Sequence, residues 1–349
     1  MNDDLPMKVA KLPLAMPDTA PNPVALSIVV PCYNQEAGLR ELLRRSGAAC
    51  RAVFGESYEI ILVDDGSADK TWPIIAALAE EDRHVVGVKL SRNYGHQLAL
   101  SAGLSAVRGD LVLIIDDDLQ DPPELLAPMY EMMREAAADV VYGQRRTRIG
   151  ETRFKTRTAA LFYRFLAKAT DLDIPLDTGD FRLITRRVAD IIAHMPERDR
   201  FIRGMVAWLG FRQVPFLYDR EARFAGTTQY TLRKLLSFAV DALVSFSILP
   251  LRIATYLGGL LTVVLSIVGC YAVVSHLVSG IAPGWASLVL LIVGASAAQL
   301  MVLGVIGEYI GRIYMESKHR PLFLIAELHR ANFSTSASQT VNANRDTVS

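Results

Sequence analysis

Cysteine is scarce in this chain of 349 residues. Its cysteines are Cys32, Cys50 and Cys270, and they have no regular spacing. Disulfide frameworks and zinc sites both need cysteines in pairs or close sets. We therefore expect neither, and we interpret these side chains as reduced, structural thiols.

A long apolar run is missing from the N-terminus, where residues 1–24 hold several prolines instead. A signal peptide needs a basic start followed by a continuous apolar core, so we expect none. Residues 1–24 are predicted to be a disordered tail, and the polar composition of residues 331–349 favours the same prediction there.

An excess of charge is missing too, because 37 Lys and Arg residues balance 37 Asp and Glu residues. The total points to no class of partner, and we expect no nucleic-acid partner. One local basic stretch stands out. Such a stretch can be a solvated face, attract anionic lipid or hold a phosphate. Its basic members are Arg145, Arg146, Arg148, Arg153, Lys155 and Arg157.

Apolar residues, by contrast, make up 51% of the chain, and mean hydropathy is +0.24. Residues 253–275 and 285–307 contain no Asp, Glu, Lys or Arg. Each run exceeds the roughly 20 residues that cross a hydrocarbon core as a helix. We predict two transmembrane helices within residues 253–317, with buried core helices as the alternative.

Basic residues flank this hairpin on its outer sides, whereas the loop 276–284 has no Lys or Arg. The positive-inside rule then places the preceding domain and both termini in the cytoplasm, with residues 318–349 as a cytoplasmic tail. Residues 233–252 have the composition of an amphipathic juxtamembrane helix or of an ordinary surface helix. Glycines in both spans permit close helix packing, so we expect a homo-oligomer in the lipid bilayer.

Residues 25–232 alternate apolar, β-rich runs with helical patterns. The predicted strands are 26–31, 58–63, 85–90, 111–115 and 140–142, and the predicted helices are 38–50, 69–82, 97–107 and 123–137. This alternation is typical of an α/β domain with a mainly parallel sheet covered on both faces. Ligands of such sheets bind beyond the carboxyl ends of the strands, and polar clusters do follow the strands here.

The most informative cluster contains Asp116, Asp117 and Asp118. Carboxylates this close repel one another unless they are solvated or neutralised. A hard cation such as Mg²⁺ or Mn²⁺ neutralises them and takes carboxylate, amide and phosphate oxygens as ligands. The alternative is a solvated acidic turn. We interpret Asp121 as the N-cap of the helix that begins at the following prolines.

The cluster at residues 64–69 also allows two interpretations. A carboxylate there can accept a hydrogen bond from a nucleobase N–H group. Alternatively, the cluster is a turn into a helix that Ser67 or Asp69 caps.

Six motifs occur in order along residues 26–328: VPCYNQE from Val30, DDGSADKT from Asp64, RNYGHQ from Arg92, DDDLQDPPE from Asp116, DTGDFR from Asp177 and GEYIGR from Gly307. Together they resemble the inverting family-2 glycosyltransferases with the nucleotide-diphospho-sugar transferase (GT-A, Rossmann-like) fold. Within that family the likeness is to polyprenyl-phosphate glycosyltransferases, such as bactoprenol glucosyltransferases and dolichyl-phosphate mannose synthases.

The resemblance implies roles for particular residues. Around the nucleotide-sugar it implies Pro31, Tyr33, Glu36, Asp65, Asp117 and Arg223. Around the Mg²⁺ or Mn²⁺ ion it implies Asp116, Asp118 and Gln120, and at the acceptor phosphate Arg145, Lys155 and Arg157. Asp180 would orient the acceptor or the sugar. The chain departs from the family where Asp117 replaces a small residue and where Thr228 and Gln229 replace the usual Ser and Lys.

The reaction that the resemblance implies is inverting transfer of a sugar, glucose from UDP-glucose, to undecaprenyl phosphate. It would take place at the cytoplasmic face of a bacterial inner membrane, on a multi-pass protein. A phosphate monoester is already largely ionised at neutral pH, so this acceptor needs no strong general base. GDP-mannose or another nucleotide-sugar is the alternative donor. Alternatives of another class are a processive polysaccharide synthase and an inactive membrane scaffold.

Overall fold

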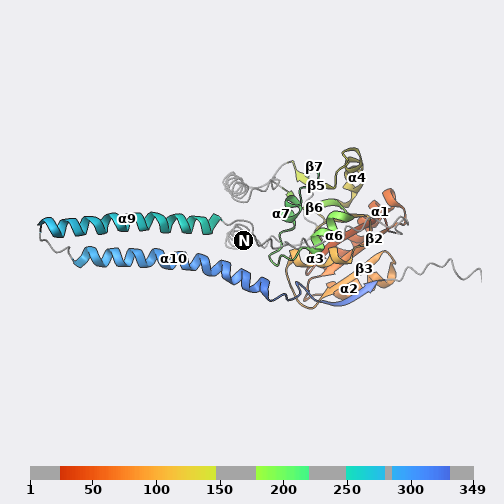
Figure 1. Cartoon of the computed structure of the whole chain (residues 1–349). Coiled ribbons are helices and arrows are strands. Elements are labelled where there is room, and N and C mark those ends of the chain that lie inside the picture. The colour runs from red at the N-terminus through yellow and green to blue at the C-terminus, as the bar shows by residue number, and fades with distance from the viewer. Residues whose placement is uncertain (1–23, 147–177, 220–248, 280–284, 331–349) are drawn as a thin grey trace, which may run out of the picture.

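The computed structural model describes residues 24–146, 178–219, 249–279 and 285–330. An eight-stranded sheet forms the centre of one domain, and a helical hairpin projects from it (Figure 1). The strand order is β7-β5-β6-β4-β1-β2-β3-β8. The predicted N-terminal tail to residue 23, residues 220–248 and residues 331–349 lie outside the described residues.

The centre of the sheet is parallel, as predicted. Its strands are β1 (Leu26–Cys32), β2 (Tyr58–Asp64), β3 (Val85–Leu90) and β4 (Leu111–Ile114). They pair in parallel in the order β4-β1-β2-β3. Every residue of β1 and β2 is buried, because helices cover both faces of a parallel sheet.

Helices pack on both faces of this centre. They are α1 (Leu39–Phe54), α2 (Thr71–Glu81), α3 (His96–Ala106), the 3₁₀ turn η1 (Pro123–Leu125) and α4 (Leu126–Glu135). Ile28 and Val30 of β1 pack into one core cluster with residues of α1, α2 and α4. Val29 packs into a second cluster with residues of α3. Because successive side chains of a strand point to opposite faces of the sheet, β1 contributes to the hydrophobic core on both faces.

Three further strands lie beyond β4, and of these only β5 (Val140–Arg145) was predicted, as residues 140–142. The unpredicted strands are β6 (Thr178–Thr185) and β7 (Gln213–Tyr218), which pairs in parallel with β5; α6 (Arg186–His194) and α7 (Ile202–Trp208) lie nearby. Strand β6 runs antiparallel between β4 and β5. The backbone of Asp180 therefore belongs to a strand, β6.

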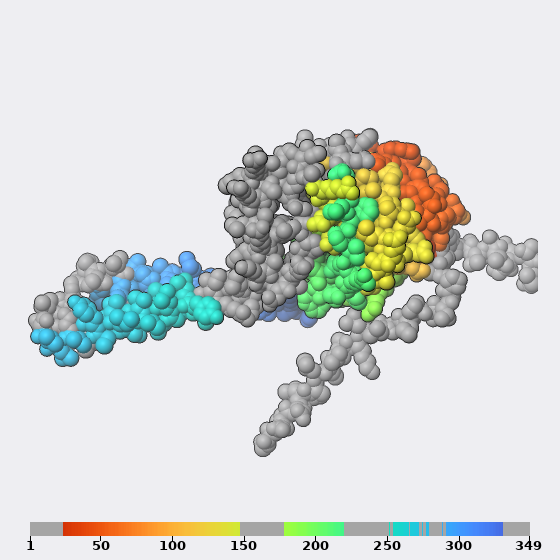
Figure 2. All heavy atoms as spheres, turned by 90° about the horizontal axis from the view of Figure 1, so that it is seen from above, coloured from red at the N-terminus to blue at the C-terminus, as the bar shows by residue number. Residues whose placement is uncertain are grey.

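The hairpin consists of α9 (Leu249–Ser279) and α10 (Trp285–Ser317), which lie side by side (Figure 1). Each contains a window long and apolar enough to cross a membrane, Ala254–Tyr271 and Leu291–Ser317. Only 6% of the first window and 0% of the second are buried. Figure 2 shows the hairpin extending away from the sheet domain. This exposure argues against the alternative of buried core helices and favours association with a membrane.

After α10 the chain returns to the sheet. Strand β8 (Ile325–Arg330) pairs antiparallel with β3 at the sheet edge. The backbone N–H of Ser91 also donates to the carbonyl of Leu324 at 2.9 Å. Residues 325–330, which the sequence placed in a C-terminal tail, thus complete the sheet of the N-terminal domain.

Candidate active site

Asp65 holds the loop between β3 and α3 in place. Gly66 has a φ of +66°, and a Cβ there would lie 2.5 Å from the backbone of Arg92 and Asn93. Because Gly66 lets the two loops approach closely, the Asp65 carboxylate accepts hydrogen bonds from the N–H groups of Tyr94 (2.7 Å) and Gly95 (2.9 Å). Burial raises the pKa of Asp65 despite these bonds. Both carboxylate oxygens of Asp65 therefore accept hydrogen bonds from the backbone of the loop between β3 and α3.

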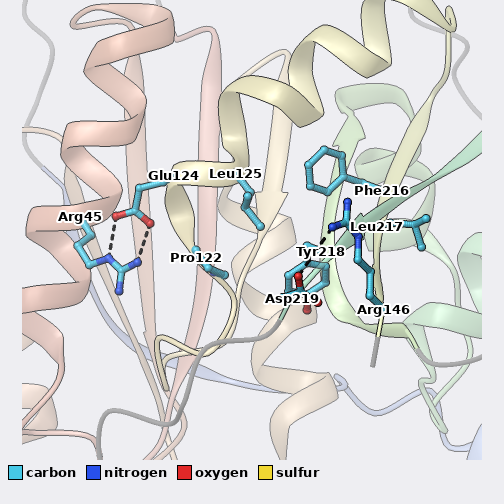
Figure 3. Close-up of a pocket in the computed structure, with 9 residues that line it drawn as sticks. All are labelled: Arg45, Pro122, Glu124, Leu125, Arg146, Phe216, Leu217, Tyr218 and Asp219. Atoms are coloured by element: carbon cyan, nitrogen blue, oxygen red, sulfur yellow. Dashed lines mark hydrogen bonds and ion pairs between the residues drawn. The ribbon is translucent and has the colours of Figure 1, made fainter. Parts of the chain in front are cut away.

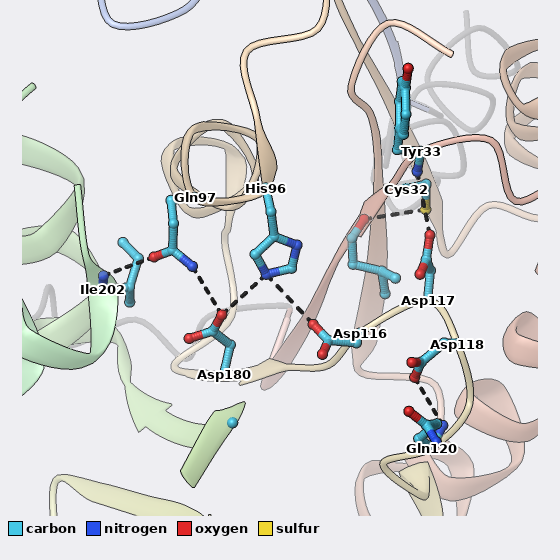
Figure 4. A network of polar contacts seen from close by, with 12 residues as sticks. Cys32, Tyr33, His96, Gln97, Asp116, Asp117, Asp118, Gln120, Asp180 and Ile202 are labelled. Atoms are coloured by element: carbon cyan, nitrogen blue, oxygen red, sulfur yellow. Dashed lines mark hydrogen bonds and ion pairs between the residues drawn. The ribbon is translucent and has the colours of Figure 1, made fainter. Parts of the chain in front are cut away.

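The three consecutive carboxylates after β4 point to different partners (Figure 4). Asp117 accepts a hydrogen bond from the backbone N–H of Tyr33 at 3.3 Å. Asp118 accepts one from the backbone N–H of Gln120 at 3.1 Å. Asp116 faces the His96 ring, with Oδ1 3.6 Å from Nε2. The cluster therefore links β1, α3 and the turn before η1.

The nearby cationic groups do not fully compensate the negative charge of Asp116, Asp117 and Asp118. Burial raises the pKa of Asp116 to about 6, although His96 opposes the shift. Burial and the neighbouring Asp116 raise the pKa of Asp117 to about 7. Oδ1 of Asp116 is buried and has no hydrogen bond within the described part of the chain. Hard oxygen donors that are short of positive charge fit a divalent cation.

The described residues do not form a complete metal cage by themselves. Among them, no group of three or more His, Cys, Asp and Glu side chains could hold a metal ion. Magnesium ions in nucleotide sites are typically bound through one or two carboxylates, with substrate phosphates and water completing the shell. The donor set fits that kind of site rather than a structural one.

Asp180 is only 4% exposed and is fully engaged (Figure 4). Gln97 Nε2 and Arg203 Nε donate to it, each at 2.9 Å. His96 Nε2 lies 3.1 Å from the same carboxylate. Burial alone would raise the pKa of Asp180, but Arg203, His96 and Arg182 outweigh it and hold the pKa well below its usual value.

His96 stands between two carboxylates. Burial opposes its protonated form, but the hydrogen bond to Asp180 and the charge of Asp116 raise the pKa of the imidazole to about 9. The two carboxylates thus favour the protonated ring at neutral pH, and its side chain is 43% exposed. The register of the sheet explains why both carboxylates reach His96, because Ile114 of β4 pairs with Arg182 of β6. The chain just beyond that pair brings Asp116 and Asp180 to the same ring.

The residues expected around the nucleoside lie at the carboxyl end of β1. Pro31 is buried in the strand, whereas Tyr33 is 50% exposed. Glu36 accepts a hydrogen bond from the backbone N–H of Lys70 at 3.2 Å, just before α2. Figure 4 shows the Tyr33 ring pointing away from the carboxylates, so its face is open to a ligand.

Of the residues expected at the acceptor phosphate, Arg145 lies at the end of β5. Its Nε is buried and has no hydrogen-bond partner among the residues that the structure describes. The predicted Lys155 and Arg157, and Arg223 of the donor set, lie outside the described residues.

The predicted capping role of Asp121 is wrong. The N-cap of η1 is Pro122, without a side-chain cap. Asp121 is 1% exposed and accepts a hydrogen bond from the Tyr218 hydroxyl at 2.5 Å. Burial, followed by the charge of Asp121, raises the pKa of Tyr218. The cause is the unpredicted strand β7, which brings Tyr218 against the acidic turn.

A cavity of about 520 Å³ lies between η1 and the end of β7 (Figure 3). Arg45 and Glu124 form an ion pair at 2.7 Å on one side, and Arg146 and Asp219 lie 3.8 Å apart on the other. None of the residues predicted to bind donor, cation or acceptor lines it. Its lining residues are Arg45, Pro122, Glu124, Leu125, Arg146, Phe216, Leu217, Tyr218 and Asp219.

Sequence reasoning missed three side chains of the Asp180 network, namely Gln97, Arg182 and Arg203. Gln97 belongs to the quoted motif at residues 92–97, so a signal existed. Arg182 likewise follows Asp180 in a quoted motif. Arg203 lies on α7, far along the chain, and only the fold brings it to Asp180.

Comparison with known proteins agrees with this geometry. Residues 27–192 match the family described as Glycosyl transferase family 2. An uncharacterised glycosyltransferase of Synechocystis sp. is 44% identical over 306 residues, which cover 87% of this chain and 96% of the relative. A bactoprenol glucosyl transferase of Shigella phage SfII is 37% identical over 308 residues, covering 88% and 99%.

Among solved structures, S. aureus TarS in complex with UDP-GlcNAc matches 64% of this chain and 66% of its own, with 17% identity and a TM-score of 0.44. That likeness is too distant to inform the site, whereas the sequence relatives extend over nearly their whole length. The chain therefore belongs to glycosyl transferase family 2, as a membrane-associated glycosyltransferase with the GT-A fold.

Proposed function

We propose that this protein transfers glucose from UDP-glucose to undecaprenyl phosphate, with inversion, at the cytoplasmic face of a bacterial inner membrane. The product would be a polyprenyl-phosphate-linked sugar for modification of cell-envelope glycans. One observation carries the proposal. A partly buried carboxylate cluster at the carboxyl edge of the sheet occurs in a chain that is 37% identical to a bactoprenol glucosyl transferase over 99% of that relative's length.

The donor would lie across the ends of β1 and β2. The half-exposed ring of Tyr33 offers a face for the base. Asp65 shapes the nucleoside pocket through the loop amides that it holds. Pro31, Glu36 and Asp117 complete the donor side, and Arg223 joins them from outside the described residues.

A Mg²⁺ or Mn²⁺ ion would be held by Asp116, Asp118 and Gln120. When bound, it offsets negative charge on the departing diphosphate. The pKa values of Asp116 and Asp117, which burial raises first and neighbouring carboxylates raise further, support this role. His96 adds a second positive charge beside Asp116.

The acceptor phosphate would meet Arg145, Lys155 and Arg157, since guanidinium groups match phosphate oxygens. Because a phosphate monoester is already ionised, no group has to remove a proton from it. The low pKa of Asp180 and its three hydrogen-bond donors suit a positioning role rather than that of a base.

The proposed orientation in the membrane rests on charge. Basic residues flank both helices on the side of the sheet domain, and by the positive-inside rule this favours a cytoplasmic position for that domain and both termini. A lipid-borne phosphate would then reach the site from the bilayer surface. Association of several copies through the glycine-containing helices stays a prediction.

The test incubates the purified full-length protein with a short polyprenyl phosphate and labelled UDP-glucose, UDP-GlcNAc or GDP-mannose, with and without EDTA. We expect a lipid-phospho-glucose that disappears with EDTA. Asp118→Asn should lose most activity. Glu124→Gln is the matched control, because Glu124 belongs to the same acidic run but pairs with Arg45.

Other outcomes would separate the alternatives. Transfer from GDP-mannose alone would change the donor, and a product with many sugars would indicate a processive synthase. No lipid-linked product from any donor would refute the enzymatic proposal. Full activity of Asp118→Asn would remove the proposed cation role.

A further inference from the structure

Residues 198–203, here called the α6–α7 connector, touch both the membrane hairpin and the Asp180 network. Residues 198–201 lie between α6 and α7 in the chain, and residues 202 and 203 begin α7. No motif in the sequence singles them out. Their contacts nevertheless join the hairpin to the active site, and a transferase with a lipid acceptor must hold these two parts in a fixed relative position.

At its first end the connector is bound to the end of α10 that lies nearest the sheet domain. The backbone N–H of Arg198 donates to Glu316 Oε1 at 3.0 Å. The Nη1 group of Arg198 donates to the carbonyl of Arg320 at 2.9 Å. Asp199 forms an ion pair with Arg312 of α10.

In the middle, Arg200 fixes the connector to the domain. It is 7% exposed, and its guanidinium donates to the carbonyls of Ile192, at 2.7 Å, and Met195. A buried guanidinium with such partners resists displacement. Arg200 therefore holds the connector to the sheet domain, so that its contacts with α10 and its contacts near Asp180 keep a fixed spacing.

At its second end the connector reaches the active site. The backbone N–H of Ile202 donates to Gln97 Oε1 at 2.9 Å, and Gln97 Nε2 donates to Asp180. Arg203 donates to Asp180 Oδ1 at 2.9 Å and to the carbonyl of Thr178 at 2.8 Å. Two of the donors that set the Asp180 carboxylate thus depend on this connector.

We propose that Arg203 and Gln97 are positioning residues for Asp180, and that the Asp199–Arg312 pair ties their position to the membrane helix α10. This inference rests on the proposed transfer to a lipid phosphate. Its physical reason is that the acceptor is presented by the bilayer, whereas the donor is bound by the sheet domain. A short, anchored connector keeps the two aligned, and misalignment by about 1 Å can cost about 100-fold in rate.

The first test measures steady-state transfer by the full-length protein in nanodiscs, with the nucleotide-sugar that the wild type uses. Arg203→Gln should lower kcat by about 100-fold, with KM for the donor changed by less than about 3-fold. Arg203→Lys should recover part of the loss, because lysine keeps the positive charge but lacks the planar set of N–H donors of the guanidinium group. A kcat of Arg203→Gln within about 3-fold of wild type would overturn the positioning role.

The second test addresses the tie to α10. Asp199→Asn and Arg312→Gln should each lower kcat by about 2- to 5-fold, as expected of an exposed pair, and the double variant should be no worse than either. Asp199→Glu should retain wild-type activity. The matched control is Asp190→Asn, which breaks the surface pair with Arg186 on α6. Equal effects of Asp199→Asn and Asp190→Asn would overturn the tie.

Hydrogen exchange supplies a readout that needs no substrate. Asp199→Asn should speed amide exchange at residues 202–204 and at the start of α3, whereas Asp190→Asn should not. Unchanged exchange there would refute the connector. A wild type without transfer would refute the proposed function alone, so the two failures are distinguishable.

Discussion

At the residue scale, the pKa of the buried Asp180 stays well below its usual value because of the charge of Arg203, the hydrogen bond from His96 and the charge of Arg182. Without such partners a buried carboxyl group takes up a proton. The same residue therefore contributes to stability and to the geometry of the site. Its neighbours depend on it in turn, since Arg182 is also nearly fully buried.

Replacing Asp180 by Asn should destabilise the protein strongly. The change leaves Arg203 and the buried Arg182 without their counter-charge, and removing one partner of a buried ion pair costs about 3–5 kcal/mol. Thermal unfolding of the detergent-solubilised protein measures the effect. Glu41→Gln is the control, because it breaks only the exposed pair with Arg44 on α1. Equal midpoints for the two variants would contradict the expectation.

The difference in unfolding free energy between wild type and Asp180→Asn should depend on pH. The pKa of Asp180 in the folded state lies well below its usual 3.8. Its contribution is therefore fully present above about pH 4 and is lost as the pH falls further. The stability difference between wild type and Asp180→Asn should shrink below pH 4. It should also shrink as the pH rises above about 6.5, because Asp180 helps to raise the pKa of His96 to about 9 and that contribution is lost towards this pH. A difference that grows as the pH falls below 4 would show that the sign for Asp180 is wrong.

Cation affinity should also depend on pH. The pKa values of Asp116 and Asp117 are raised to about 6 and about 7, so protons compete with the ion below neutrality. The affinity for Mn²⁺, measured by titration calorimetry, should rise from pH 5.5 to pH 8 and then level off. Asp118→Asn should bind more weakly throughout. An affinity independent of pH would argue that Asp116 does not contact the ion.

At the scale of elements, α3 is held against the sheet by a glycine. A Cβ at Gly103 would lie 2.3 Å from Val29 Cγ1 and 3.1 Å from Val63 Cγ2. Gly103→Ala should therefore push α3 off β1 and β2, at a cost of about 1–3 kcal/mol. Activity should fall as well, because His96 and Gln97 begin this helix. Ser105→Ala, on the exposed side of α3, should change neither the unfolding midpoint nor kcat.

The elements that the sequence predicted are those whose signal is local. Strands β1 to β4 are continuous apolar runs, and the helices between them have clear ends. Strands β6 and β8 were missed because their partners, β4 and β3, lie far away in sequence. The residues of β8 are also largely exposed, so no apolar run marks it. The site divides in the same way: motifs revealed Asp65 and Asp116, but only the fold brings Arg203 to Asp180.

At the scale of the whole molecule, the hairpin is an insertion between two parts of one sheet. The chain leaves the domain after β7, forms α9 and α10, and returns as β8. Arg330 at the end of β8 lies 3.7 Å from the buried Glu59 and donates to the carbonyl of Ala106. The membrane helices are thus attached to the sheet domain on both sides.

A chain that ends before residue 249 should consequently be less stable than one in which a Gly-Ser linker replaces residues 249–317 and β8 is kept. Loss of β8 opens the β3 edge and removes the Arg330 charge near Glu59, an effect of about 1–3 kcal/mol. Both variants lack the exposed apolar helices, so unfolding can be followed without detergent. The linker variant should still bind UDP-glucose but should transfer poorly to acceptor in vesicles. Equal stability of the two variants would mean that β8 contributes little, and the hairpin would then be attached on one side only.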